Sequence, residues 1–187
     1  YGMEDDWTPR NSGDTYGGVL TLKRALAKSV NVVTARLIHS VGPKTVVRLA
    51  KKAGISSYIP PYPSIALGTL DASLYDMVGA YAMFANKGLR INQMIVLRIE
   101  DRNGTVLQHF TPETSQVLSE ESAYTVLELL KGVTEDGSGV RLRGRWGKYP
   151  DSISTGYPYE FKNPIAGKTG TTQNHSDGWF MGVVPNL

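Results

Sequence analysis

Residues 164–184 read PIAGKTGTTQNHSDGWFMGVV. Two runs rich in apolar residues, Thr and Gly, 164–172 and 178–184, flank a short polar segment, and this pattern predicts two strands joined by a loop. A cation, hydroxyls and a glycine follow one another on the first strand: Lys168, Thr169, Gly170 and Thr171. Such a set can hold a carboxylate-bearing peptide, because the polar groups bind the carboxylate and the glycine leaves room for a ligand backbone. The Lys-Thr-Gly triplet alone does not distinguish this site from an ordinary exposed strand.

The residues before these strands are mostly helical in pattern. Apolar spacing and capping residues predict helices at about 21–28, 33–41, 44–53, 73–85 and 119–133. Asn103-Gly104 lies between two strand-like runs, 94–101 and 105–110, and predicts a β-hairpin. The first eighteen residues and the three-proline segment 59–63 predict irregular or extended chain.

A second set of candidate residues, Ser29 and Asn31, lies at the junction of two predicted helices. Ser and Asn are favoured at such junctions simply because they cap helices. Taken alone, the Ser-x-Asn pattern therefore favours a capping turn.

Read together, several segments resemble the transpeptidase domain of class A, bifunctional penicillin-binding proteins. They are ALAKSVNV at 25–32, IALGT at 65–69, AYAMFANKG at 80–88, GKTGTT at 167–172 and DGWFMG at 177–182. These enzymes and the related β-lactamases carry the motifs S-x-x-K, S-D-N and K-T-G. Ser29-Val30-Asn31 corresponds to the second motif, and Lys168-Thr169-Gly170 to the third.

The resemblance implies an α+β fold, called α/β in some schemes, of the β-lactamase and penicillin-binding-protein transpeptidase type. It implies a helix-rich lobe with part of an antiparallel sheet, so that residues 1–187 form a partial transpeptidase domain. The first motif is absent, because no serine in the sequence has a lysine three residues later. We therefore expect the nucleophilic serine upstream of Tyr1 and the last strands and closing helix after Leu187. The glycosyltransferase domain and the membrane anchor are also expected outside this chain.

The resemblance also implies roles for individual residues. Ser29, Asn31 and Lys168 would be catalytic, and Thr169, Gly170 and Thr171 would bind substrate. The intact enzyme would acylate its serine with the D-Ala-D-Ala end of a peptidoglycan stem peptide and pass the acyl group to a neighbouring amine. β-Lactams would react at the same serine, and this chain alone would be inactive. The expected location is the periplasm or the outer face of the cytoplasmic membrane.

Two other functions remain open at this point. A D,D-carboxypeptidase or serine β-lactamase of the same fold would use water as acceptor. A non-catalytic sensor of β-lactams or peptidoglycan would keep the groove without turnover. The incomplete sheet predicts that missing domain segments or a second chain cover it, and Trp179 and Phe180 are expected in the core.

The amino-acid composition excludes several other classes of function and partner. The chain has no cysteine, which excludes thiolate catalysis and disulfides, and no apolar run long enough for a membrane span. The net charge is +3, and the densest basic stretch consists of Arg141, Arg143, Arg145 and Lys148. It lies among glycines and has no pattern suited to reading bases, so we expect no nucleic-acid partner. The three histidines lack ligand spacing, so no metal and no cofactor are expected. Gly137-Ser138-Gly139 follows a helix end and does not predict a phosphate-binding loop.

Overall fold

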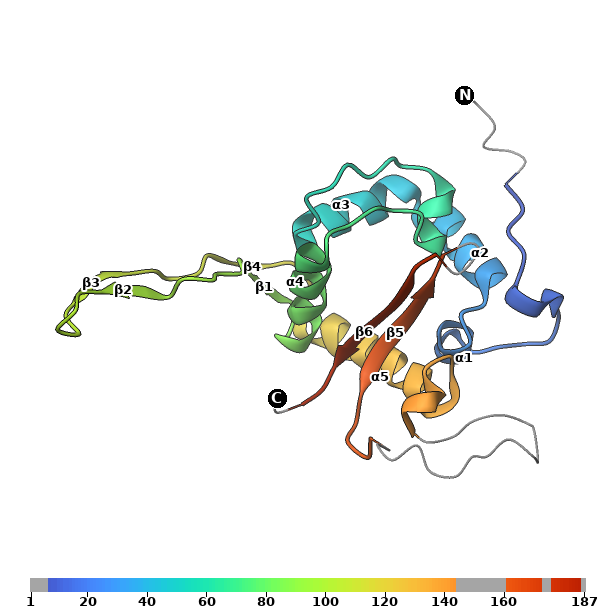
Figure 1. The fold of residues 1–187 in the computed structure, drawn as a ribbon. Coiled ribbons are helices and arrows are strands. Elements are labelled where there is room, and N and C mark those ends of the chain that lie inside the picture. Colours follow the sequence, from blue (N-terminus) through green and yellow to red (C-terminus); the bar gives the residue numbers. More distant parts are fainter. Residues whose placement is uncertain (1–6, 144–160, 173–175, 186–187) are drawn as a thin grey trace.

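The computed structural model describes residues 7–143, 161–172 and 176–185, and shows a helical body with a long arm (Figure 1). The helices are α1 Leu22–Ala27, α2 Asn31–Val41, α3 Pro43–Ala53, α4 Leu74–Ala85 and α5 Glu120–Asp136, with short 3-10 turns η1 Ser12–Asp14, η2 Pro63–Leu67 and η3 Val140–Arg143. The strands are β1 Leu89–Ile91, β2 Arg98–Glu100, β3 Val106–His109, β4 Thr114–Gln116, β5 Ala166–Thr171 and β6 Gly178–Val183. Arg145, Lys148 and His175 lie outside the described residues.

Side-chain caps fix where three of the helices begin. Thr21 accepts a hydrogen bond from the Arg24 amide, Ser73 from the Asp76 amide, and Ser119 from the Ser122 amide: these caps open α1, α4 and α5. Each satisfies a backbone N–H that has no partner inside the helix. The predicted helix starts at Thr21, Ser73 and Ser119 are therefore confirmed.

The strands of the described residues form three separate antiparallel pairs. β5 pairs with β6 in the body, and α5 passes behind this pair in Figure 1 and contacts β5. β1 pairs with β4 at the base of the arm, and β2 pairs with β3 farther out. The hairpin around Asn103-Gly104 is confirmed, and β1 and β4 are two short strands that the sequence pattern did not predict.

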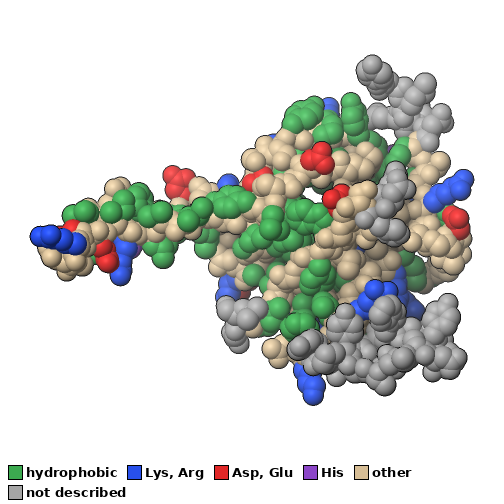
Figure 2. Space-filling view, viewed as in Figure 1, with side chains coloured by type: hydrophobic (Ala, Val, Ile, Leu, Met, Phe, Trp, Pro, Cys, Tyr) green, Lys and Arg blue, Asp and Glu red, His purple; other side chains and the backbone are tan. Residues whose placement is uncertain are grey.

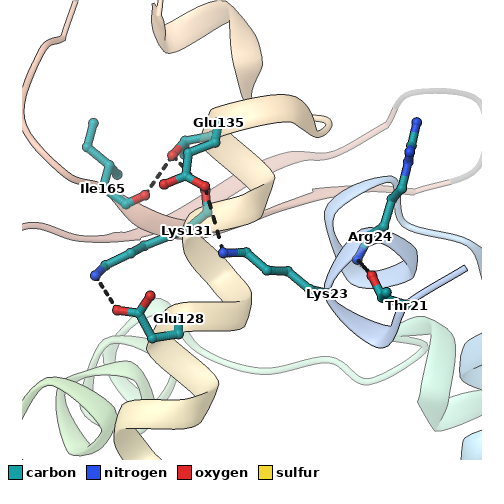
Figure 3. Close-up of polar contacts among 8 residues, drawn as sticks. Thr21, Lys23, Arg24, Glu128, Lys131, Glu135 and Ile165 are labelled. Carbon is teal, nitrogen blue, oxygen red and sulfur yellow. Dashed lines mark hydrogen bonds and ion pairs between the residues drawn. The ribbon is translucent and has the colours of Figure 1, made fainter.

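The core lies where α5 meets α1 and β5. Ala27, Val133 and Ile165 are buried there. The buried hydroxyl of Thr134 donates a hydrogen bond to the Ile165 carbonyl at 2.6 Å, which joins α5 to the residue before β5. Lys23 of α1 also reaches Glu135 of α5 at 3.9 Å (Figure 3). α1 and the segment leading into β5, which are far apart in the sequence, thus both pack on α5.

Several large apolar residues of the body are exposed. They are Leu22, Leu37, Val41 and Leu49 on the helices, and Trp179 and Phe180 on β6. The buried residues of α1 and α2 are mostly small, namely Ala25, Ala27 and Ala35, with Ile38 as the one large side chain among them. Apolar side chains accordingly gather on the visible surface of the body and along the arm (Figure 2).

The prediction that Trp179 and Phe180 pack in the core is wrong for the described residues, since they are 37% and 42% exposed. Phe180 lies on the sheet face opposite the buried Met181, because successive residues of a strand alternate faces. Its ring covers Gly167 and Gly182, where a Cβ would come within 2.7 and 2.9 Å of ring atoms. The ring therefore packs on the sheet backbone rather than inside the body.

Within the part of the chain that the structure describes, none of the helices has both the length and the apolar character needed to cross a bilayer.

Two glycines with the same backbone conformation offer a matched test of packing at the base of the arm. Gly88 and Gly104 have φ of +81° and +83°, but a Cβ at Gly88 would overlap the Leu118 carbonyl, whereas Gly104 has no neighbour within 4 Å. Gly104→Ala should cost at most about 1–2 kcal/mol, from the left-handed conformation alone. Gly88→Ala should cost about 1–3 kcal/mol more, because the backbone must also move. Urea unfolding of both variants checks this, and equal costs would contradict the packing described here.

Candidate active site

Ser29 ends α1 in a left-handed turn. Its φ is +56°, the Ser29 amide donates to the Leu26 carbonyl at 3.1 Å, and the Val30 amide donates to the Ala25 carbonyl at 2.9 Å. These two bonds form a Schellman motif, in which the left-handed position is usually glycine. A side chain there costs about 1–2 kcal/mol. Because serine occupies it, the turn holds a hydroxyl in a fixed direction at a cost in stability.

The end of α3 shows the same hydrogen-bond pattern with the usual residue. The Gly54 amide donates to the Lys51 carbonyl and the Ile55 amide to the Ala50 carbonyl, and Gly54 has φ of +107°. The two turns differ in the residue at the left-handed position, glycine in one and serine in the other. Strain of this kind is often found at functional sites.

The Lys168 side chain of β5 contacts the Ser29 side chain, which is far away in sequence. The Lys168 ammonium donates to the Ser29 hydroxyl oxygen at 2.9 Å and to the Thr169 carbonyl at 2.9 Å. Burial lowers the pKa of Lys168 below the ordinary lysine value of 10.5, because desolvation disfavours the charged form. The second and third motifs, 139 residues apart in sequence, therefore form one polar site.

A second contact, this time between two hydroxyl groups, also holds β5. Ser138, just after α5, lies with its hydroxyl oxygen 2.5 Å from that of Thr169, and its amide donates to the Ala27 carbonyl at 2.9 Å. Gly137 has to be glycine at this junction, since a Cβ would overlap the Ala27 carbonyl. β5 is thus bordered by the end of α1 and the end of α5.

Sequence reasoning missed Ser138. The signal available was Gly-Ser-Gly directly after a helix end, and it was considered only as a phosphate loop. The contact with Thr169 depends on the approach of α1, α5 and β5, which local sequence does not specify.

Asn31 points to a different part of the chain. Its side-chain amide donates to the Arg10 carbonyl at 2.7 Å, and Asn11 accepts from the Val32 amide at 3.1 Å. These two bonds fasten the lead-in segment to the start of α2. Although Asn31 is only two residues from Ser29 in sequence, its amide nitrogen is therefore hydrogen-bonded to the lead-in segment.

The remaining candidates follow Thr169 along β5. Gly170 and Thr171 are exposed, and β6 pairs with one edge of this strand. Thr172 closes the turn with Asp177: the Asp177 amide donates to the Thr172 hydroxyl oxygen at 2.8 Å, and that hydroxyl donates to the Asp177 carboxylate at 3.0 Å. The strand end carrying Gly170 and Thr171 is therefore both held in place and open.

Arg143 and Leu142 form hydrogen bonds to the residues just before β5, and we call this set of bonds the Arg143 clasp. The Arg143 guanidinium donates to the carbonyls of Phe161 and Asn163 at 2.6 and 2.5 Å, and the Phe161 amide donates to the Leu142 carbonyl at 3.0 Å. These bonds join η3 to the segment that leads into β5.

Comparison with known proteins assigns the family. The family of the penicillin binding protein transpeptidase domain matches residues 2–186, so the chain belongs to it. The chain is 33% identical to penicillin-binding protein 1A of Aquifex aeolicus over 98% of its length, and 34% identical to that of Clostridium novyi over 96%. It spans only 23% and 20% of those two relatives.

Solved structures agree on the fold. Penicillin-binding protein 1A from Haemophilus influenzae matches 94% of this chain and 30% of its own with a TM-score of 0.77 at 23% identity. The D,D-transpeptidase domain of a peptidoglycan glycosyltransferase from Eggerthella lenta matches 94% of this chain and 48% of its own with a TM-score of 0.71 at 22% identity. The predicted family, its class A type and the incomplete α+β transpeptidase fold are therefore confirmed.

Removing the Ser138 hydroxyl tests its contact with Thr169. Ser138→Ala should lower the free energy of unfolding by about 0.5–1.5 kcal/mol, the usual net value of a hydrogen bond. Ser138→Thr keeps the hydroxyl and should lose less. Urea unfolding gives both values, and NMR of the Thr169 methyl group should show a shift only in the alanine variant. An unchanged Thr169 signal in Ser138→Ala would contradict the contact.

The lowered pKa of Lys168 predicts a pH dependence of stability. Between the folded pKa and 10.5, the unfolded chain binds more protons at this residue, so wild-type stability relative to Lys168→Met should rise with pH. Unfolding of both proteins in urea at about pH 8 and about pH 10 measures the change, since other groups cancel in the difference. If the difference in unfolding free energy between wild type and Lys168→Met stays the same at the two pH values, or falls as the pH rises, the ammonium is not buried as described.

Proposed function

We propose that this chain is part of a serine-type D,D-transpeptidase that cross-links peptidoglycan stem peptides, with β-lactams as inhibitors. The observation that carries the proposal is the 2.9 Å hydrogen bond from Lys168 to Ser29, which joins two motifs of this family in one site. The longer protein would act in the periplasm or at the outer face of the cytoplasmic membrane. Its glycosyltransferase domain and anchor would lie outside these residues.

The geometry suits proton transfer at Ser29. A neighbouring ammonium favours the negative charge that develops when the Ser29 hydroxyl passes a proton to the leaving amine. Because burial lowers the pKa of Lys168, this residue would give up a proton to Ser29 more easily than an ordinary lysine. Ser29 and Lys168 would therefore act as a relay next to the acylated serine.

The open end of β5 suits the substrate. The hydroxyls of Thr169 and Thr171 would bind the terminal carboxylate, and Gly170 would let the stem peptide lie against the strand. The Thr171 amide would supply half of the oxyanion hole. Asn31 would contact the substrate amide through its side-chain oxygen, since the nitrogen is bound to Arg10.

The acylated serine is not among these 187 residues, because no Ser-x-x-Lys occurs in them. We propose that it is supplied by another segment of the domain, which together with further strands would cover the sheet. The exposure of Trp179 and Phe180 supports such a cover. The chain by itself would then bind the stem peptide weakly and would not be acylated.

Labelling with a fluorescent penicillin tests the proposed chemistry. The full-length protein should become labelled and this chain alone should not. In the full-length protein, Ser29→Gly should slow acylation about 10²–10⁴-fold, the usual contribution of a proton-transfer group. Glycine is the informative change because it relieves the left-handed turn, so lost activity cannot be ascribed to lost folding.

Two controls complete this experiment. Ser40→Ala removes an exposed hydroxyl on α2 and should leave labelling unchanged. Products formed from a stem-peptide donor, with and without an acceptor amine, separate a transpeptidase from an enzyme that uses water. Normal acylation in Ser29→Gly, or labelling of this chain alone, would sink the proposal.

A further inference from the structure

The arm exposes apolar side chains far from the candidate active site. Ile95, Leu97 and Leu107 are 91%, 63% and 66% exposed, and Val96, Ile99 and Val106 are exposed as well. Figures 1 and 2 show the arm standing out from the body with apolar side chains along it. A two-stranded ribbon of this kind is only marginally stable in water, so an added strand would stabilise it.

The backbone of β2 has a free edge. The Phe110 amide donates to the Leu97 carbonyl and the Asp101 amide to the Thr105 carbonyl, both at 2.9 Å, so Leu97 and Asp101 face β3. Because backbone groups alternate along a strand, those of Arg98 and Glu100 point to the other side. The register skips Leu107 on β3, which leaves β2 regular. Among the described residues, no strand pairs with that side of β2.

The charges on this edge are self-complementary. Arg98 and Glu100 lie on one face of β2, with the Arg98 Nε atom 2.5 Å from a Glu100 carboxylate oxygen. In an antiparallel pair of two such strands centred on Ile99, each Arg98 stands opposite the Glu100 of the other copy. In a parallel, in-register pair, each charge would face its own kind. The sequence Arg98-Ile99-Glu100 therefore selects the antiparallel arrangement.

We propose that β2 is a self-pairing edge, through which two copies of this chain join antiparallel with Ile99 at the two-fold axis. The four backbone bonds at Arg98 and Glu100 then form between copies, and the two ion pairs exchange partners. β2 runs outward from its own body, so the two bodies lie at opposite ends of the paired arms (Figure 1). The contact is smaller than a stable interface of about 1,200–2,000 Å², so the dimer is weak and depends on concentration.

Charged residues on an edge strand also have a purely protective role, because they discourage edge-to-edge association. The ion pair between Arg98 and Glu100 within one chain is compatible with either role. Charge-swap variants separate the two roles.

Sedimentation velocity over a concentration series tests the proposal on the whole chain. The wild-type chain should dimerise, whereas Arg98→Glu and Glu100→Arg, each alone, should weaken self-association about tenfold or more, since like charges then face each other. The double variant keeps the internal ion pair and the complementarity, so it should dimerise like wild type.

Mixing supplies the decisive control. Arg98→Glu and Glu100→Arg chains have complementary edges, so an equimolar mixture should form heterodimers at wild-type concentrations, seen by native mass spectrometry as the mixed mass. Association through the exposed faces of the body would be the same in all variants, and that result would overturn the proposal. A wild-type chain that stays monomeric at every concentration would do so too.

Discussion

The hydrogen bond from the Ser138 amide to the Ala27 carbonyl is the contact on which the site depends. It joins the end of α5 to the end of α1, and Gly137 makes the approach possible because it has no side chain. The bond from Thr134 to Ile165 then sets β5 against the same helix. With these two contacts in place, Lys168 reaches a serine that follows α1 directly, and two segments at opposite ends of the chain form one site.

Local features were predictable because local chemistry decides them. The caps at Ser73 and Ser119 and the turn at Gly54 each depend on a few neighbouring residues, so sequence alone indicated where those helices begin or end. The pairing of Ser29 with Lys168 came from family motifs rather than from any pattern of spacing. The buried faces of the helices and the role of Ser138 depend on which elements meet, and three-residue strands such as β1 carry too little periodicity to detect.

Two features of the site run against stability. Serine in a left-handed turn is strained, whereas the equivalent turn after α3 has glycine. Burial of the Lys168 ammonium is also unfavourable, as its lowered pKa shows. Both costs fall within the candidate site, and each fixes the position of a polar group, the Ser29 hydroxyl or the Lys168 ammonium. The stable helices around α5 hold this strained site in place.

The clasp formed by Arg143 has a consequence for how the domain tolerates change. The Phe161 amide donates to the Leu142 carbonyl, and the Arg143 guanidinium donates to the Phe161 carbonyl. These bonds hold the residues after α5 next to the residues before β5. Because these bonds set the start of β5, we expect insertions or deletions between Leu142 and Phe161 to leave Lys168 in place. A change in the length of this segment should therefore disturb the site less than a change at Arg143 itself.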